Sequence, residues 1–247
     1  MADRPVPNIP SATYRLQFNN RFTFRDATSI VGYLHDLGIT DIYASPYFKS
    51  KKGSLHGYDI VDHNYLNPEI GTHEDYMAMI AELHRHGMGQ VLDIVPNHMC
   101  VECPENAWWM DVLENGPSSP YAQYFDIEWA PVKKELRSKV LLPMLGDQYG
   151  NILEGQELKV DLGEGAFFVH YSEHRFPLEP RTYVLILEHR LQELQAGLPE
   201  GHADLAELLS IITALKHLPS PAETDTAKVE ERYREKEVIK RRLSTLF

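Results

Sequence analysis

Two short polar segments of this chain carry residue types that suit a sugar ligand. The first is GSLHGYD at residues 53–59, which contains His56, Tyr58 and Asp59. A sugar offers an apolar ring face bordered by hydroxyl groups, so an aromatic plate between polar side chains matches it. The same letters also fit a glycine-rich loop whose tyrosine packs on a neighbour, and loop statistics alone favour that second interpretation.

The second segment is DIVPNH at residues 93–98. Asp93 lies in a mostly apolar stretch, where an ionised carboxylate needs a paired charge or hydrogen bonds. Asn97 and His98 follow that stretch, and an imidazole can donate a hydrogen bond to a sugar hydroxyl without ionising it. Taken singly, these two residues fit equally well a strand-capping asparagine and a half-buried structural histidine.

The first hundred residues alternate between strand-like and helix-like patterns. Strand-like stretches cover residues 12–18, 39–44 and 90–95, the last of them apolar enough to be buried on both faces. Between them lie two helix-like stretches, each opened by a capping-box pattern and closed by a glycine. These signals are Thr23 with Asp26, Gly38, Thr72 with Asp75, and Gly87.

This alternation predicts parallel βα units, either in a barrel or in a doubly wound sheet. Both polar segments follow predicted strands. Because loops after consecutive parallel strands gather at one rim of the sheet, we expect Tyr58 and His98 to face the same cleft.

The alternation stops after residue 100, so we expect residues 1–100 and 101–247 to form different parts of the fold. Residues 101–182 are irregular, with strand-like pieces at 139–142 and 166–171, and residues 183–247 are helical. Three helices are expected there, and the last, after a linker at 219–225, is charged and mainly solvated. Apolar side chains line the first two: Leu187, Leu191, Leu194, Leu198, Leu205, Leu208, Ile212 and Leu215.

For the other residues that could bind a metal ion or a sugar, we expect structural roles. Cys100 and Cys103 could hold zinc or act as a redox pair, but no complete ligand set is evident, so we expect no metal and two small buried thiols. His170 and His174 stand four residues apart within a predicted strand, which argues against a metalloprotease helix. The Trp108–Trp109 pair could stack on sugar, although adjacent tryptophans more often anchor a loop on the core.

Composition limits the partners of the chain. Its 247 residues are 43% hydrophobic and 24% charged, and the formal net charge is -12. A surface of that sign repels phosphate backbones and anionic lipids, so we expect no nucleic-acid or membrane partner. The N-terminus lacks the pattern of a signal peptide and no apolar stretch is long enough to span a bilayer, which favours a cytoplasmic location.

Together, the two polar segments resemble the α-amylase superfamily, glycoside hydrolase family 13. Its first signature, DxxxNH, is present as Asp93, Asn97 and His98. That element identifies only the superfamily. Longer stretches across nearly the whole chain resemble maltooligosyltrehalose synthases: ATYRLQF, GSLHGYD, WWMDVLENGPSSPYAQYFDIEW, KVLLPMLG and YSEHRFPL. The cysteine pair departs from this family and inherits no role from it.

The resemblance implies an α/β fold, the N-terminal part of a (β/α)₈ TIM barrel. About three βα units would precede a large, largely helical insertion. Tyr58 would stack on the glucose at the scissile bond, and His98 would bind its hydroxymethyl group with His56 nearby. Asp93, Asn97 and Asp59 would support the site. No cofactor is implied.

The resemblance further implies a retaining transfer that converts the reducing-end α-1,4 bond of a maltooligosaccharide to α,α-1,1. The nucleophile and the acid/base of the superfamily follow later strands, so we expect them beyond Phe247 and expect this chain alone to be inactive. Its partners would be the maltooligosaccharide and the C-terminal half of the same enzyme. Two alternatives stay open: a related α-amylase or 4-α-glucanotransferase fragment, and a non-catalytic glucan-binding module.

Overall fold

The computed structural model describes residues 9–247, which fall into two compact units, Met1–Asn106 and Ala107–Phe247. We call these unit 1 and unit 2. The elements of unit 1 are β1 (Thr13–Leu16), α1 (Phe24–Asp36), β2 (Asp41–Ala44), β3 (Phe48–Ser50), β4 (Ile60–Leu66), α2 (His73–Arg85) and β5 (Gly89–Leu92).

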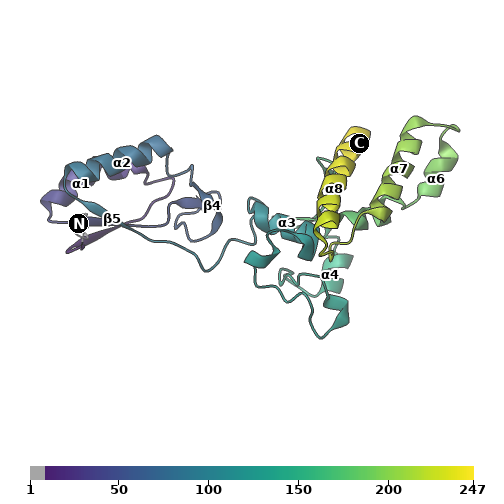
Figure 1. Ribbon diagram of the computed structural model, residues 1–247, viewed down its shortest axis with the longest axis horizontal. Helices are drawn as coiled ribbons and strands as arrows, with labels where there is room; N and C mark the ends of the chain where they lie inside the picture. Colours follow the sequence, from purple (N-terminus) through teal and green to yellow (C-terminus); the bar gives the residue numbers. More distant parts are fainter. Residues whose placement is uncertain (1–8) are drawn as a thin grey trace. The chain divides into compact units, whose positions relative to one another are not determined.

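Unit 1 is built from two parallel βα crossovers. Strands β1, β2 and β5 form a parallel sheet in that order, with Thr13 opposite Asp41 and Asp41 opposite Gly89. Helices α1 and α2 lie side by side on one face of this sheet (Figure 1). Ile42 and Ala44 are buried on that face, at 1% and 0% exposed, so the core lies between the sheet and the two helices.

Local sequence signals define both helices. The capping boxes of Thr23 with Asp26 and of Thr72 with Asp75 are both formed. They satisfy backbone amides that the first helical turn leaves without partners. The helices end before Gly38 and Gly87, whose φ angles of +87° and +67° lie in the left-handed region that favours glycine.

The third parallel strand differs from its prediction. It ends at Leu92 rather than at residue 95, so Asp93 lies just past the strand and not inside it. Nor is the strand buried on both faces, since Val91 is 38% exposed. Within the described residues this sheet has three strands and helices on one face only, so the opposite face keeps Tyr43 and Val91 partly exposed.

The segment between β2 and α2 contains two further strands, which the sequence analysis did not predict. Strands β3 and β4 pair antiparallel with irregular register, and the GSLHGYD segment connects them. Gly53 and Gly57 have φ angles of +77° and +76°. A Cβ atom on Gly57 would lie 3.1 Å from the carbonyl oxygen of Pro46, so this turn requires glycine.

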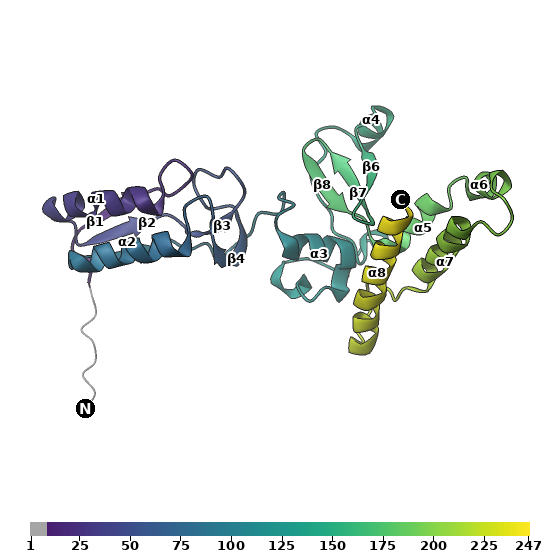
Figure 2. The ribbon, with the colours of Figure 1, turned by 90° about the horizontal axis from the view of Figure 1, so that it is seen from above.

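Unit 2 combines an antiparallel sheet with helices (Figure 2). Strands β6, β7 and β8 pair in sequence order, and Tyr183, Ile211 and Leu243 are fully buried where α5, α7 and α8 pack beside β7. The elements are α3 (Ala107–Asn115), α4 (Tyr149–Glu154), β6 (Lys159–Gly163), β7 (Ala166–Tyr171), β8 (His174–Pro177), α5 (Tyr183–Leu187), α6 (Leu191–Gly197), α7 (Ala203–His217) and α8 (Thr226–Leu246).

Several expectations for unit 2 are corrected. Residues 139–142 form no strand, because their backbone joins no ladder. The leucine run expected as one helix is two, α5 and α6, because Arg190 adopts a left-handed φ of +56° between them. The adjacent tryptophans lie on α3 rather than in a loop. The strand predicted at residues 166–171 is present as β7.

Most charged residues of helix α8 are exposed or partly exposed, as expected for a mainly solvated helix, but two of them are buried. Arg232 is 0% exposed and pairs with Glu179 at 3.0 Å. Lys236 is 3% exposed and pairs with Glu114 of α3 at 2.9 Å, and Lys240 bonds the same carboxylate. The sequence shows that α8 is charged. Only the structure shows that Glu114 of α3 and Glu179, just after β8, pair with its buried charges.

Candidate functional site

Three side chains meet just past the carboxyl end of β5. Arg15 of β1 donates to the carboxylate of Asp93 at 3.1 Å and to the hydroxyl of Tyr58 at 2.9 Å. The Tyr58 hydroxyl in turn donates to the same carboxylate oxygen of Asp93. The Arg15 guanidinium also lies 4.4 Å from the ring centre of Tyr43. This cluster provides the paired charge that Asp93 was expected to need.

The hydrogen bonds fix the protonation states of the cluster. The hydrogen bond from Tyr58, with the nearby Arg15 charge, holds the pKa of Asp93 below its usual range despite partial desolvation. The same hydrogen bond to Asp93 raises the pKa of Tyr58, which therefore stays protonated at neutral pH. Asp93 is accordingly a fixed anion, and Tyr58 offers its neutral ring.

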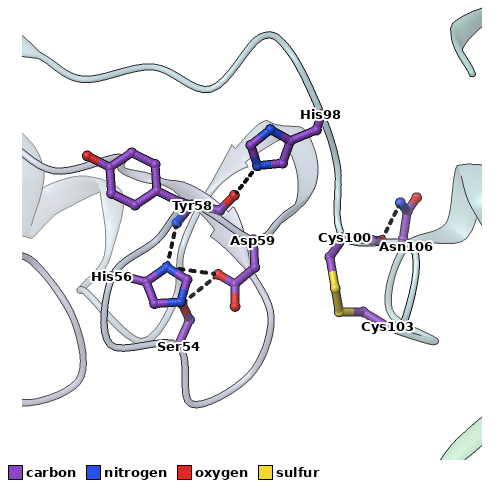
Figure 3. Close-up of a disulfide and its surroundings, with 8 residues drawn as sticks. All are labelled: Ser54, His56, Tyr58, Asp59, His98, Cys100, Cys103 and Asn106. Carbon is purple, nitrogen blue, oxygen red and sulfur yellow. Dashed lines mark hydrogen bonds and ion pairs between the residues drawn. A yellow bond between two sulfur atoms is a disulfide. The ribbon is translucent and has the colours of Figure 1, made fainter. Parts of the chain in front are cut away.

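The imidazoles of His56 and His98 each contact the backbone of Tyr58 (Figure 3). His98 Nε2 lies 3.1 Å from the Tyr58 carbonyl oxygen, and the Tyr58 amide donates to His56 Nδ1 at 3.0 Å. The His56 ring is stacked near Tyr58, with centroids 6.1 Å apart and 24° between planes. Tyr58 is 37% exposed, so its ring remains accessible to a ligand.

Asp59 and Asn97 have different surroundings. The Asp59 carboxylate accepts a hydrogen bond from Ser54 Oγ at 2.5 Å and lies 3.9 Å from His56 Nδ1. Ser54 Oγ also accepts from the Gly57 amide at 3.1 Å, which closes the turn. Asn97 is exposed and makes no hydrogen bond with the described part of the chain.

Residues at the end of β1 hold the GSLHGYD segment in place, and the sequence analysis missed them. Gln17 Nε2 donates to the carbonyl oxygens of Leu55 and His56 at 3.1 and 3.0 Å, and Asn19 Nδ2 donates to that of Leu55 at 3.0 Å. The signal was the run of polar residues Arg15, Gln17 and Asn19, which fall on every second position in and just after the strand-like stretch at residues 12–18.

The two cysteines are joined as a disulfide, which corrects the expectation of two free buried thiols. Their Cα atoms lie 5.8 Å apart, within the range that a disulfide bridges. The bond follows His98 by two residues (Figure 3). Across residues 9–247 no group of three or more histidine, cysteine and carboxylate side chains is placed to hold a metal ion.

In unit 2, three of the stretches that resemble maltooligosyltrehalose synthases converge on one hollow of about 300 Å³. Trp129 closes the first stretch, Lys139 opens the second, and Phe176 belongs to the third. Trp108 does not reach this hollow: its ring stacks on Tyr121 with centroids 5.2 Å apart. These stretches are therefore joined by tertiary packing within unit 2.

Parallel βα units with a polar cluster past their strand ends define an α/β protein of the class that places ligand sites at the carboxyl ends of its strands. Residues 24–177 match the family model described as alpha amylase, catalytic domain. The chain belongs to this alpha-amylase family.

Several of the more similar relatives are maltooligosyl trehalose synthases. A putative maltooligosyl trehalose synthase of Mycobacterium tuberculosis is 44% identical over 142 residues, which cover 55% of this chain and 18% of that protein. The structure of the synthase from Arthrobacter ramosus is 45% identical with a TM-score of 0.61, over 69% of this chain and 21% of the other. A hypothetical maltooligosyl trehalose synthase of Sulfolobus tokodaii is 35% identical with a TM-score of 0.59, over 75% and 24%.

The match thus spans about a fifth of the length of these relatives. Amylases are also similar: an intracellular maltogenic amylase of Bacillus subtilis is 38% identical over 100 residues, which are 40% of this chain and 16% of that protein. Among the described residues, no helix is long and apolar enough to cross a membrane.

Proposed function

We propose that this chain supplies part of the sugar-binding site of a maltooligosyltrehalose-synthase-type isomerase. Such an enzyme converts the reducing-end α-1,4 bond of a maltooligosaccharide to an α,α-1,1 bond. The observation that carries the proposal is the cluster of Arg15, Tyr58 and Asp93, which fixes an accessible aromatic ring beside two imidazoles. The 44% identity to a putative maltooligosyl trehalose synthase supports an α-glucan as the substrate.

Each residue of the cluster has a defined part in this proposal. The Tyr58 ring stacks on a glucose ring, while His98 and His56 bind its hydroxyl groups. Asp93 and Asp59 hold the tyrosine and the turn in place, and Asn97 is the exposed amide beside them. We expect no cofactor, and the net charge of -12 argues against nucleic-acid and membrane partners.

We propose that neither Asp93 nor Asp59 is the nucleophile of the transfer reaction. A retaining transfer needs two carboxyl groups about 5 Å apart across the glycosidic bond. Asp93 is held by Arg15 and Tyr58, and Asp59 is held by Ser54. Both therefore position other groups, and the chain alone should form no trehalose linkage.

We propose an architecture in two parts, divided a few residues before the boundary between unit 1 and unit 2. Residues 1–100 would be the first three βα units of a TIM barrel, and residues 101–247 an inserted subdomain. The exposed side chains of Tyr43 and Val91 support this assignment, because a barrel strand presents such residues to its interior. A cytoplasmic location is proposed with it.

Binding of maltopentaose to the full chain, measured by calorimetry, tests the proposal. Tyr58→Ala and His98→Ala should each weaken binding about tenfold, because each removes one contact worth about 1 to 2 kcal/mol. Tyr33→Ala is the matched control, since Tyr33 is a tyrosine of α1 that is 66% exposed. If all three variants bind equally well, the site is assigned to the wrong residues.

The similarity to a maltogenic amylase favours a second candidate, a hydrolytic or glucan-transferring amylase. The products that the intact enzyme forms from maltopentaose separate the two. Loss of reducing ends without shortening indicates the isomerase, and shortened or elongated maltodextrins indicate the amylase. If the intact protein binds maltopentaose but forms neither kind of product, it is a glucan-binding module.

A further inference from the structure

The segment that carries Asn97 and His98 is fixed to unit 1 at both of its ends. At the start, the Asp93 amide donates to the Ala44 carbonyl oxygen at 3.0 Å. At the end, the Cys100 amide donates to the Ile60 carbonyl oxygen at 2.8 Å. The residues between these anchors belong to no helix or strand. Between the anchors, His63 Nε2 lies 3.1 Å from the Val95 carbonyl oxygen, so the position of His98 depends on this contact and on how firmly the second anchor is held.

The disulfide stiffens the second anchor (Figure 3). It ties Cys100 to Cys103, which is 0% exposed. Asn106 completes the turn: its amide donates to the Cys103 carbonyl oxygen at 3.0 Å, and its side chain donates to the Cys100 carbonyl oxygen at 2.9 Å. Without the covalent bond, hydrogen bonds and the burial of Cys103 are the contacts that hold this turn.

The two cysteine residues differ in exposure. Cys100 is half-buried and Cys103 is fully buried, so an external thiol can reach the Cys100 sulfur first. These are also the two cysteines of the whole chain, so the bond belongs to no disulfide framework. In a reducing compartment, an isolated bond of this kind is usually transient or redox-sensing rather than structural.

We propose that Cys100 and Cys103 form a reversible redox site that controls the sugar-binding segment. In the disulfide form the turn holds His98 against the Tyr58 carbonyl, and in the dithiol form the segment is released and glucan binds less tightly. The part of this inference that concerns glucan rests on the proposed function. The part that concerns the order of the segment does not.

The reaction partner is a dithiol protein or a low-molecular-weight thiol. A thiolate of the reductant attacks the Cys100 sulfur, the bond between the two cysteines breaks, and Cys103 leaves as a thiolate that takes up a proton. A second thiolate then attacks the mixed disulfide and releases Cys100, which takes up another proton. The cysteine pair gains two electrons and two protons, and the reductant leaves as a disulfide.

The size of the effect is limited by the short loop that the bond closes. Closing a loop of four residues reduces the number of conformations of the open chain by a factor of about 20 at most. We therefore expect reduction to weaken maltopentaose binding by about threefold to twentyfold.

The experiment compares the full chain in oxidised and in reduced glutathione, with the thiols counted by alkylation and mass spectrometry. Hydrogen exchange is then measured for peptides covering residues 94–106, with peptides of α1 as the internal control. We expect faster exchange at the Cys100 and Asn106 amides after reduction and no change in α1. The double variant Cys100→Ser, Cys103→Ser should match the reduced chain and no longer respond to glutathione.

Three results would overturn the inference. The first is a cysteine pair that glutathione neither oxidises nor reduces. The second is equal exchange of residues 94–106 in both states, and the third is equal maltopentaose affinity in both states. If exchange responds to redox state but maltopentaose binds in neither state, the redox site stands and the proposed glucan ligand is wrong.

Discussion

The Tyr58 hydroxyl donates to the Asp93 carboxylate although 35 positions separate the two residues in sequence. This bond joins the turn between β3 and β4 to the end of β5, and Arg15 of β1 completes the link. Three separate stretches of chain thus meet at one carboxylate. Changes at Asp93 should therefore affect all of them.

Asp93→Asn should loosen unit 1 at neutral pH. The amide keeps the shape of the carboxylate but loses the charge that pairs with Arg15, so protected amides of β1 and β5 should exchange about fivefold to tenfold faster. Hydrogen exchange is the suitable measurement, because all three tryptophans lie in unit 2 and their fluorescence does not report on unit 1. Asp36→Asn is the control, since that carboxylate is 85% exposed, and equal effects of the two changes would contradict the role given to Asp93.

The effect of Asp93→Asn should disappear in acid. The pKa of Asp93 is lowered in the folded chain, so its ion pair stabilises the fold fully above the unfolded pKa of about 3.9. That stabilisation is lost as pH falls through the lower folded pKa. The difference in exchange between the two proteins should persist at pH 6 and shrink on acidification. A difference that grows in acid would contradict this sign.

Tyr58→Phe should raise the pKa of Asp93, because the hydrogen bond from the phenol is the largest cause of its lowering. The aromatic ring remains, so maltopentaose binding should change much less than in Tyr58→Ala. Carbon-13 titration of the Asp93 carboxyl measures the pKa directly. An unchanged pKa would show that Arg15 alone determines the charge state.

Gly165→Ala should destabilise unit 2 by about 2 kcal/mol or more. Gly165 has a φ of +74°, and a Cβ atom there would lie 1.8 Å from the backbone oxygen of Lys240 in α8. Urea unfolding followed by tryptophan fluorescence reports on this unit. Gly150→Ala in α4 is the matched control, since no atom lies within 4 Å of the added Cβ, and it should be neutral or slightly stabilising.

Lys236→Met should destabilise unit 2 by about 2 to 4 kcal/mol, because it leaves Glu114 buried with one lysine instead of two. Burial acts to raise the pKa of Glu114, but the charges of Lys236 and Lys240 outweigh it and the pKa is lowered. The double variant Glu114→Leu, Lys236→Met should be less destabilised than Lys236→Met alone. Tryptophan fluorescence in urea measures both, and additive losses would argue against a direct interaction.

Prediction from the sequence succeeded where the deciding contact is local. The capping boxes at Thr23 and Thr72 each act over three residues, so the letters alone reveal them. The break between α5 and α6 at Arg190 was missed because the helical spacing of leucines continues across it. A residue in the left-handed region does not change that spacing. The buried lysine of α8 was missed because its partner Glu114 lies 122 positions away.

The same limit applies to the candidate site. His56, Tyr58, Asp59, Asp93 and His98 could be selected from their types and from the strand ends that precede them. Arg15 could not, because its pairing with Asp93 spans 78 positions. A strand-like stretch does not show which of its polar side chains turn toward a distant loop.

The bonds from Gln17 and Asn19 to the backbone of the GSLHGYD turn have a consequence for protein engineering. The shape of the turn depends on more than its own seven residues, because carbonyl oxygens of the turn are also bound by the side chains of Gln17 and Asn19, which follow β1. A designer who transplants residues 53–59 into another protein must also transplant Gln17 and Asn19. The smallest segment that can be transplanted is therefore the turn together with residues that follow β1, more than thirty positions before it.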